Sequence, residues 1–110
     1  MTQAELIDHI NRLGVNTIDR ESQPGLILFK QPDTDRIFAI IHDGTNPLRV
    51  EAKCDPQLSK LLRGKYESVL ASANMDKKSW NEIICSGQLN SDEVKDLVTL
   101  AYHLSLTNPD

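Results

Sequence analysis

The sequence contains no apolar run long enough to span a membrane, and its first residues lack the basic start and apolar stretch of a signal peptide. It has only two cysteines, Cys54 and Cys85, and they do not form a Cys-x-x-Cys unit. Thiols in a chain without a secretion signal are expected in a reducing compartment, where a structural disulfide does not form. We therefore expect a cytoplasmic protein with two free thiols and no membrane segment.

Glycine is scarce, with five residues in a chain of 110. The chain has too few glycines for a phosphate-cradling loop, and it contains neither a Walker motif nor a dinucleotide-binding signature. Nucleophilic catalysis needs a serine or cysteine beside a base, and no serine lies in a nucleophile elbow. The sequence therefore predicts a protein that is not an enzyme and that carries no cofactor.

Metal-binding spacings are missing as well. The three histidines, His9, His42 and His103, lie too far apart for a pair of ligands on one helix, and surface or half-buried imidazoles explain them. Carboxylates one helical turn apart, such as Glu5 and Asp8, are typical of exposed helix faces. A site that the fold assembles from distant residues stays open, but the sequence itself predicts no metal site.

Charge is unevenly distributed along the chain. The net charge of −4 argues against a protein that coats nucleic acid through bulk positive charge. Residues 1–52 carry five Lys/Arg and eight Asp/Glu, residues 53–78 carry six and three, and residues 79–110 carry one and five. A basic middle segment therefore lies between two acidic ones.

Hydrophobic periodicity predicts a helix followed by a β-meander in the first half. The helix covers residues 2–13, beginning with a capping box at Thr2 and Glu5 and ending at Gly14. After a polar linker, apolar runs at 26–30, 36–42 and 48–53 are separated by turn residues and predict three antiparallel strands. In the third run, apolar residues alternate with Arg49, Glu51 and Lys53, so one face is core and the other faces solvent or a partner.

The second half predicts further helices and one more strand. Asp55 as N-cap and Pro56 at the first helical position begin a short helix that ends at Gly64, and residues 65–73 are a loop or a brief extended segment. Asp76 caps a single turn, and residues 80–85 form a fourth strand. Ser91 caps a last helix that Asn108 and Pro109 end. We expect one domain, residues 1–110, with an α+β fold: a two-layer sandwich whose antiparallel sheet is covered on one face by helices.

The basic middle segment is the one group of residues with a specific functional interpretation. If the fold brings its cations together, they would contact a phosphate backbone while Tyr66 or Trp80 offers an aromatic face. The predicted nucleic-acid contacts are Arg49, Lys53, Lys60, Arg63, Lys77, Lys78 and Trp80. The alternative is that the cations are ordinary solubilising residues and that the single tryptophan belongs to the core.

Several short motifs resemble the MmcQ/YjbR family of small bacterial proteins. They lie within residues 36–106 and include LRVEAKCDP at 48–56, NMDKKSWN at 74–81, SDE at 91–93 and AYHL at 101–104. The resemblance implies a frataxin-like (CyaY-like) topology and a DNA-binding role in a "double wing" arrangement. The family often has histidines where this chain has Asn74 and Ser79, so any role of those imidazoles is not carried over.

Three functional hypotheses follow from the residues and the resemblance. The first is DNA binding through the basic residues named above, and we expect the protein to be a monomer. The second is a protein-interaction adaptor with a mixed-charge docking face that includes Arg49, Glu51 and Lys53. The third follows from the frataxin-like fold and is weak binding of iron or another divalent metal by acidic residues, namely Glu5, Asp8, Asp19 and Glu21.

Overall fold

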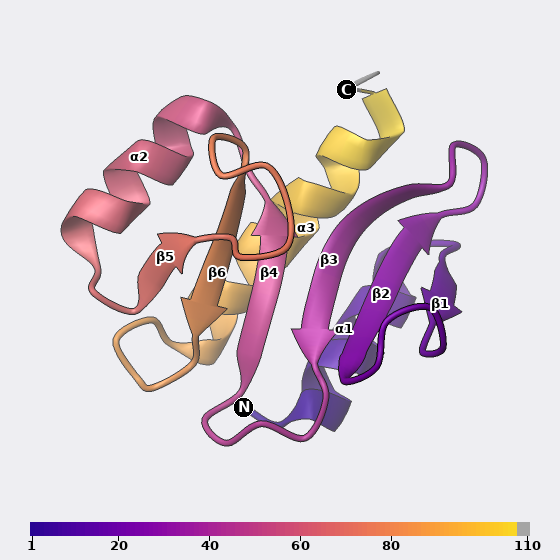
Figure 1. Cartoon of the computed structure of the whole chain (residues 1–110), viewed down its shortest axis with the longest axis horizontal. Helices are drawn as coiled ribbons and strands as arrows, with labels where there is room; N and C mark the ends of the chain where they lie inside the picture. The colour runs from indigo at the N-terminus through magenta and orange to yellow at the C-terminus, as the bar shows by residue number, and fades with distance from the viewer. Residues whose placement is uncertain (108–110) are drawn as a thin grey trace.

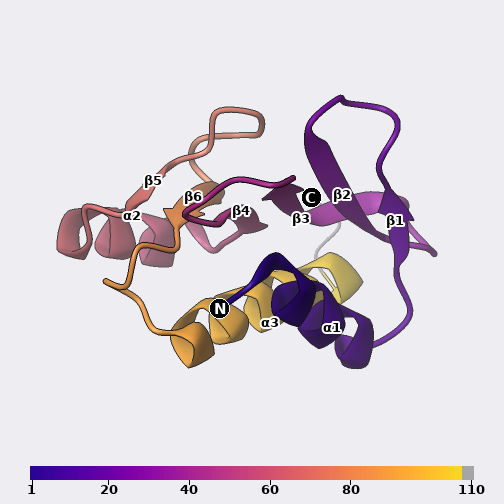
Figure 2. The ribbon, with the colours of Figure 1, turned by 90° about the horizontal axis from the view of Figure 1, so that it is seen from below.

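The computed structural model describes residues 1–107 and contains a six-stranded antiparallel sheet with three helices packed on it (Figure 1). In sheet order, the strands are β1 (Thr17–Asp19), β2 (Leu26–Gln31), β3 (Arg36–His42), β4 (Arg49–Lys53), β6 (Trp80–Ile84) and β5 (Val69–Ala71). Helices α1 (Gln3–Leu13) and α3 (Ser91–Thr107) cover one face of the sheet (Figure 2), and α2 (Pro56–Lys65) packs beside β5 and β6. The predicted α+β sandwich is confirmed.

Side-chain caps begin all three helices. In α1, the Thr2 hydroxyl accepts a hydrogen bond of 3.1 Å from the Glu5 N–H, as the sequence predicts. In α2, the Asp55 carboxylate accepts from the next two free backbone N–H groups, and Pro56 is the first helical residue. The two predicted starts are confirmed because each depends only on adjacent residues.

The cap of α3 differs from the prediction by one residue. Asn90 Oδ1 accepts from the Glu93 N–H at 2.9 Å, and Glu93 Oε1 accepts from the Asn90 N–H at 3.0 Å. This reciprocal arrangement satisfies two backbone donors, whereas a Ser91 cap would satisfy one, so the prediction of Ser91 was wrong. The predicted helix end at Asn108 and Pro109 lies outside the described residues.

The main core lies between the sheet and the two helices that cover it. Its fully buried side chains come from α1, from the central strands and from α3, and they include Leu6, Ile10, Phe29, Phe38, Ile41, Val50, Ile83, Val94 and Val98. Tyr102 of α3 packs edge-on against Phe38, with ring centroids 5.2 Å apart. Among the described residues, no helix combines the length and the apolar character needed to cross a lipid bilayer.

Gly14 ends α1 where the Tyr102 ring leaves no room for a side chain. A Cβ at this position would clash with the Tyr102 phenol oxygen, and the ring is held by Phe38 behind it. We expect Gly14→Ala to lower the free energy of unfolding by about 1–3 kcal/mol, measured by urea denaturation.

Gly64 is the control for this substitution. It lies in α2, and a Cβ added there would have no neighbouring atom within 4 Å, so Gly64→Ala should stabilise the protein by up to about 1 kcal/mol. Equal stability of the two variants would show that the contact with Tyr102 does not constrain Gly14.

Two edge strands differ from the sequence prediction. Residues 17–19, expected as part of a polar linker, form β1 and pair with β2 through Thr17 and Lys30. Residues 69–71 lie in the segment 65–73, for which the sequence predicted either a loop or a brief extended segment. They form β5 beside β6. Both strands are three residues long, too short for an alternation pattern to identify, and each is defined only by its pairing with the next strand along the chain.

The sheet face opposite α1 and α3 is covered in part by the segment that joins β5 to β6. Figure 1 shows this segment, residues 72–79, crossing in front of β4 and β6. Beneath it and beside it lies a second apolar cluster in which Leu28, Ile40 and Trp80 are buried and Met75 packs on them. The predicted outward face of β4 is therefore not solvent-exposed at Glu51, which is fully buried.

Candidate functional site

Four basic side chains from two segments line one shallow depression on the surface. Lys60 and Arg63 come from α2, and Lys77 and Lys78 come from the turn just before β6. Together with Pro56 at the start of α2, they surround a volume of about 390 Å³. The three lysines are exposed, so their ammonium groups are free to reach an anion in this basic depression.

Hydrogen bonds hold the two sides of the basic depression together. Arg63 Nη2 donates to the Lys77 carbonyl at 2.6 Å, which fixes the turn against α2. The turn itself is closed by Asp76, whose carboxylate accepts from the Lys78 N–H at 3.0 Å and from the Ser79 hydroxyl at 3.2 Å. The cations are therefore presented on a preorganised backbone.

Two acidic residues directly precede lining residues of the basic depression in sequence, and backbone N–H groups engage both of them. Asp55 accepts from two N–H groups in the first turn of α2, and Asp76 accepts from the Lys78 N–H. A carboxylate already bonded to N–H donors competes less for the neighbouring ammonium groups. The depression consequently keeps a positive character although the chain as a whole is acidic.

The remaining residues of the predicted nucleic-acid set lie elsewhere. Arg49 forms an ion pair with Glu82, and Lys53 lines a separate hollow beside Arg36 and Met75. Trp80 is 3% exposed and packs in the second apolar cluster, so it lies in the core, as the alternative interpretation of the tryptophan expected. The structure therefore brings four of the seven predicted residues together in the basic depression, and it places Lys53 and Trp80 beside one another at the separate hollow, where the tryptophan is almost wholly buried.

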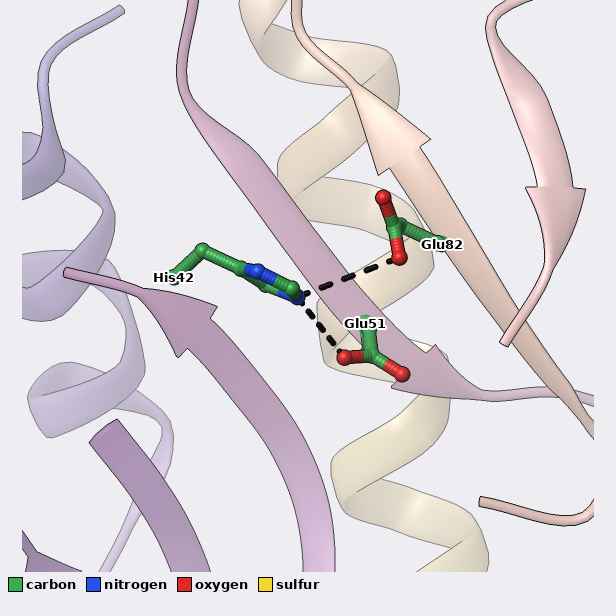
Figure 3. Close-up of side chains that lie close together, drawn as sticks. All are labelled: His42, Glu51 and Glu82. Carbon is green, nitrogen blue, oxygen red and sulfur yellow. Dashed lines mark hydrogen bonds and ion pairs between the residues drawn. The ribbon is translucent and has the colours of Figure 1, made fainter. Parts of the chain in front are cut away.

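A second group of side chains with possible ligand atoms lies on the sheet face that the 72–79 segment partly covers. His42 at the end of β3, Glu51 of β4 and Glu82 of β6 point toward one another (Figure 3). His42 Nε2 lies 2.8 Å from Glu51 Oε2 and 3.9 Å from Glu82 Oε1. We call these three residues the His-Glu-Glu cluster.

Glu51 is the most heavily bonded member of the His-Glu-Glu cluster. Ser72 donates to its Oε1, and Asn74 Nδ2 donates to its Oε2 at 2.6 Å. Burial alone would raise the pKa of Glu51, but the hydrogen bonds from Ser72, Asn74 and His42, with the charge of His42, lower it below the ordinary glutamate value. Glu51 is therefore a buried carboxylate that stays ionised.

Sequence reasoning missed the His-Glu-Glu cluster. The alternation along β4 placed Glu51 on an outward face, and a histidine at a strand end needed no ligand to explain it. The signal that could have found the cluster is the cross-strand pairing of Glu51 with Glu82, because two carboxylates directly opposite each other require a cationic or protonated partner. That pairing depends on β6 lying next to β4, which sequence does not reveal.

The structure does not bring the other predicted acidic set together. No three of Glu5, Asp8, Asp19 and Glu21 place carboxylate oxygens within 4.8 Å of one another. Asp8 instead pairs with Arg12 at 3.1 Å, and Asp19 pairs with Lys30 at 3.4 Å.

The mixed-charge docking face is also changed by burial. It required Glu51 on the surface beside Arg49 and Lys53, and Glu51 is 0% exposed. That part of the adaptor hypothesis was wrong, because the 72–79 segment covers the carboxylate.

Both thiols are in environments that disfavour ionisation. Burial raises the pKa of the Cys54 thiol, and the same cause raises the pKa of Cys85. Because the thiolate is the reactive form, both cysteines should react more slowly with a disulfide reagent at pH 8 in the native protein than in the urea-unfolded chain. Equal rates in the two states, measured by absorbance after mixing, would contradict this assignment.

Comparisons with known proteins identify relatives of this chain by sequence and by fold. The family model described as YjbR matches residues 17–104. The crystal structure of Deinococcus radiodurans protein DR2400, which has a DUF419 domain, superposes with a TM-score of 0.90 at 20% identity, covering 99% of this chain and 81% of that one. Among curated proteins, no sequence matches this chain significantly.

Two structures of a Pseudomonas syringae protein share the same fold. Its crystal structure gives a TM-score of 0.81 at 23% identity and covers 96% of this chain and 99% of that one. The solution structure gives 0.76 at 22% identity, with 96% and 93% covered. At these identities the likeness concerns the fold, and it reaches across nearly the whole chain.

Proposed function

The chain belongs to the YjbR family, and we propose that it binds nucleic acid, specifically DNA, through the basic depression. The observation that supports this proposal is the convergence of Lys60, Arg63, Lys77 and Lys78 on one surface. They come from two segments, α2 and the turn before β6, and the fold brings these segments together. The family resemblance implies the same role.

The chemistry of the basic depression favours contacts with the phosphate backbone. Lysine ammonium groups on flexible stems neutralise phosphates without reading the sequence of the bases. Arg63 is half-buried and donates to the Lys77 carbonyl, so it orders the surface as well as adding charge. Trp80 is buried and cannot stack on a base in this arrangement. We therefore expect binding that varies little between DNA sequences.

Salt dependence of binding is the first test. With four phosphate contacts, the logarithm of the association constant for duplex DNA should fall with the logarithm of salt concentration at a slope of about −3.6. Fluorescence anisotropy of a labelled duplex measures this slope directly. Binding that does not weaken as salt rises would contradict a phosphate-contact mechanism.

A pair of double variants locates the surface. Lys77→Ala with Lys78→Ala removes two exposed cations from the basic depression and should lower the slope to about −1.8, with a loss of roughly tenfold in affinity per lysine near 0.1 M salt. Arg20→Ala with Lys65→Ala removes the same charge from exposed positions outside the depression. If both double variants weaken binding equally, overall charge rather than this surface is responsible.

A further inference from the structure

The His-Glu-Glu cluster gathers three ligand-type side chains from three adjacent strands. Glu51 and Glu82 are direct cross-strand partners in the β4–β6 pair, and His42 lies at the end of β3 on the other side of β4. Figure 3 shows the imidazole and both carboxylates converging on one point. Because sheet strands fix the backbone of all three residues, their spacing is set by the sheet and not by a mobile loop.

Each carboxylate has one oxygen that faces His42. Ser72 donates to Glu51 Oε1, whereas Oε2 faces the imidazole and also accepts from Asn74 Nδ2 at 2.6 Å. The Arg49 guanidinium forms an ion pair with Glu82 Oε2, which has no other polar partner, and Glu82 Oε1 lies 3.9 Å from His42 Nε2, beyond hydrogen-bonding distance. In metal sites, outer partners of this kind orient the carboxylate ligands, and an ion bound at Glu51 Oε2 would share that oxygen with the Asn74 donor.

The distances suit a small divalent cation. Ligand–metal bonds of 2.0–2.2 Å in tetrahedral geometry separate the ligand atoms by about 3.3–3.6 Å. The separations from His42 Nε2 are 2.8 Å and 3.9 Å, and the three ligand atoms all lie within 4.8 Å of one another. Side-chain movements of less than about 1 Å would therefore complete a three-ligand site, with water as a further ligand.

The charges of the buried residues also favour a cation. The side chains of Glu51 and Glu82 are 0% and 5% exposed, and Arg49 is the only arginine or lysine that pairs with either of them among the described residues. A coordinating imidazole is neutral, so in a metal site the two carboxylates and the one guanidinium sum to a negative charge, and burial makes uncompensated charge costly. A divalent ion bound between the imidazole and the two carboxylates would compensate it.

From this geometry we propose that His42, Glu51 and Glu82 bind one divalent ion of a first-row transition metal. One imidazole and two carboxylates suit Zn²⁺, Fe²⁺ or Mn²⁺, whereas Mg²⁺ and Ca²⁺ prefer six or more oxygen ligands. In the bound state, Nε2 of His42, Oε2 of Glu51 and Oε1 of Glu82 are the ligand atoms. Ser72 and Arg49 are positioning residues that hold the two carboxylates.

Calorimetric titration of the chelator-treated protein with Zn²⁺ is the first test. The wild-type chain should bind one Zn²⁺, and His42→Gln and Glu82→Gln should each weaken binding at least about tenfold. His103→Gln removes an exposed imidazole elsewhere and should leave the affinity unchanged, as should Glu5→Gln combined with Asp8→Asn on α1. Circular dichroism confirms that each variant is folded before titration.

A second measurement needs no substitution. Mn²⁺ added in less than equimolar amount to ¹⁵N-labelled wild-type protein should broaden the amide signals of residues 42, 51 and 82 and spare those of α1. Absence of one-to-one binding with Zn²⁺ and Mn²⁺ at millimolar concentration would overturn the proposal. Retention of full affinity in both site variants, or broadening centred on α1, would overturn it equally.

Discussion

Replacing Trp80 with alanine should lower the free energy of unfolding by about 3–5 kcal/mol, one of the largest effects of any single change in this chain. Trp80 is 3% exposed and forms the second apolar cluster with Leu28 and Ile40, and Met75 packs against that cluster. Its removal would leave a cavity under the segment that joins β5 to β6. Urea denaturation followed by far-ultraviolet circular dichroism measures the loss without relying on tryptophan emission.

Two further variants show whether the loss comes from burial of Trp80. Trp80→Phe keeps an aromatic ring in the cluster and should cost less than Trp80→Ala. Leu61→Ala changes a side chain of α2 that is 65% exposed and should change stability by no more than about 0.5 kcal/mol. A Trp80→Ala protein with nearly wild-type stability would contradict the assignment of this residue to the core.

Removing the Glu51 carboxylate should be comparably damaging. Glu51→Ala leaves the donors of His42, Ser72 and Asn74 without their acceptor and is expected to cost about 3–5 kcal/mol. The reason is that a buried polar network loses its centre and its members keep their desolvation cost. The same urea denaturation measures this loss.

The Glu51 network also fixes the segment before the basic turn. Ser72 accepts from the N–H groups of Asn74 and Met75 while donating to Glu51, so the carboxylate organises this stretch of chain. Glu67→Ala removes an exposed carboxylate and is the matched control, with an expected change within about 0.5 kcal/mol. Equal stability of the two variants would show that the Glu51 network does not stabilise the fold.

Local patterns in the sequence predicted most of the fold. The capping residues Thr2 and Asp55 and the turn residues between the apolar runs act over a few positions, so the starts of α1 and α2 and the strands β2, β3 and β4 could be identified without tertiary information. β1 and β5 could not, because three-residue edge strands form only when a partner strand is already present. The insertion of β6 between β4 and β5 depends on a long-range pairing, that of residues 49–53 with residues 80–84.

The candidate sites show the same division. The basic residues were evident from the charge distribution, but only folding places Lys60 and Arg63 of α2 against Lys77 and Lys78. The His-Glu-Glu cluster was hidden because alternation along β4 indicates which face Glu51 is on and does not indicate that the 72–79 segment covers that face. The sequence therefore shows which residues are charged, but the topology of the fold determines which of them lie close together.

The most direct test of nucleic-acid binding is an amide-resolved titration of ¹⁵N-labelled protein with a short DNA duplex at low salt. We expect chemical-shift changes concentrated at residues 56–63 and 76–79, around the basic depression, and their reversal when salt is raised. No shift changes at low salt, or changes centred on α1 and the β1–β2 connection, would contradict it.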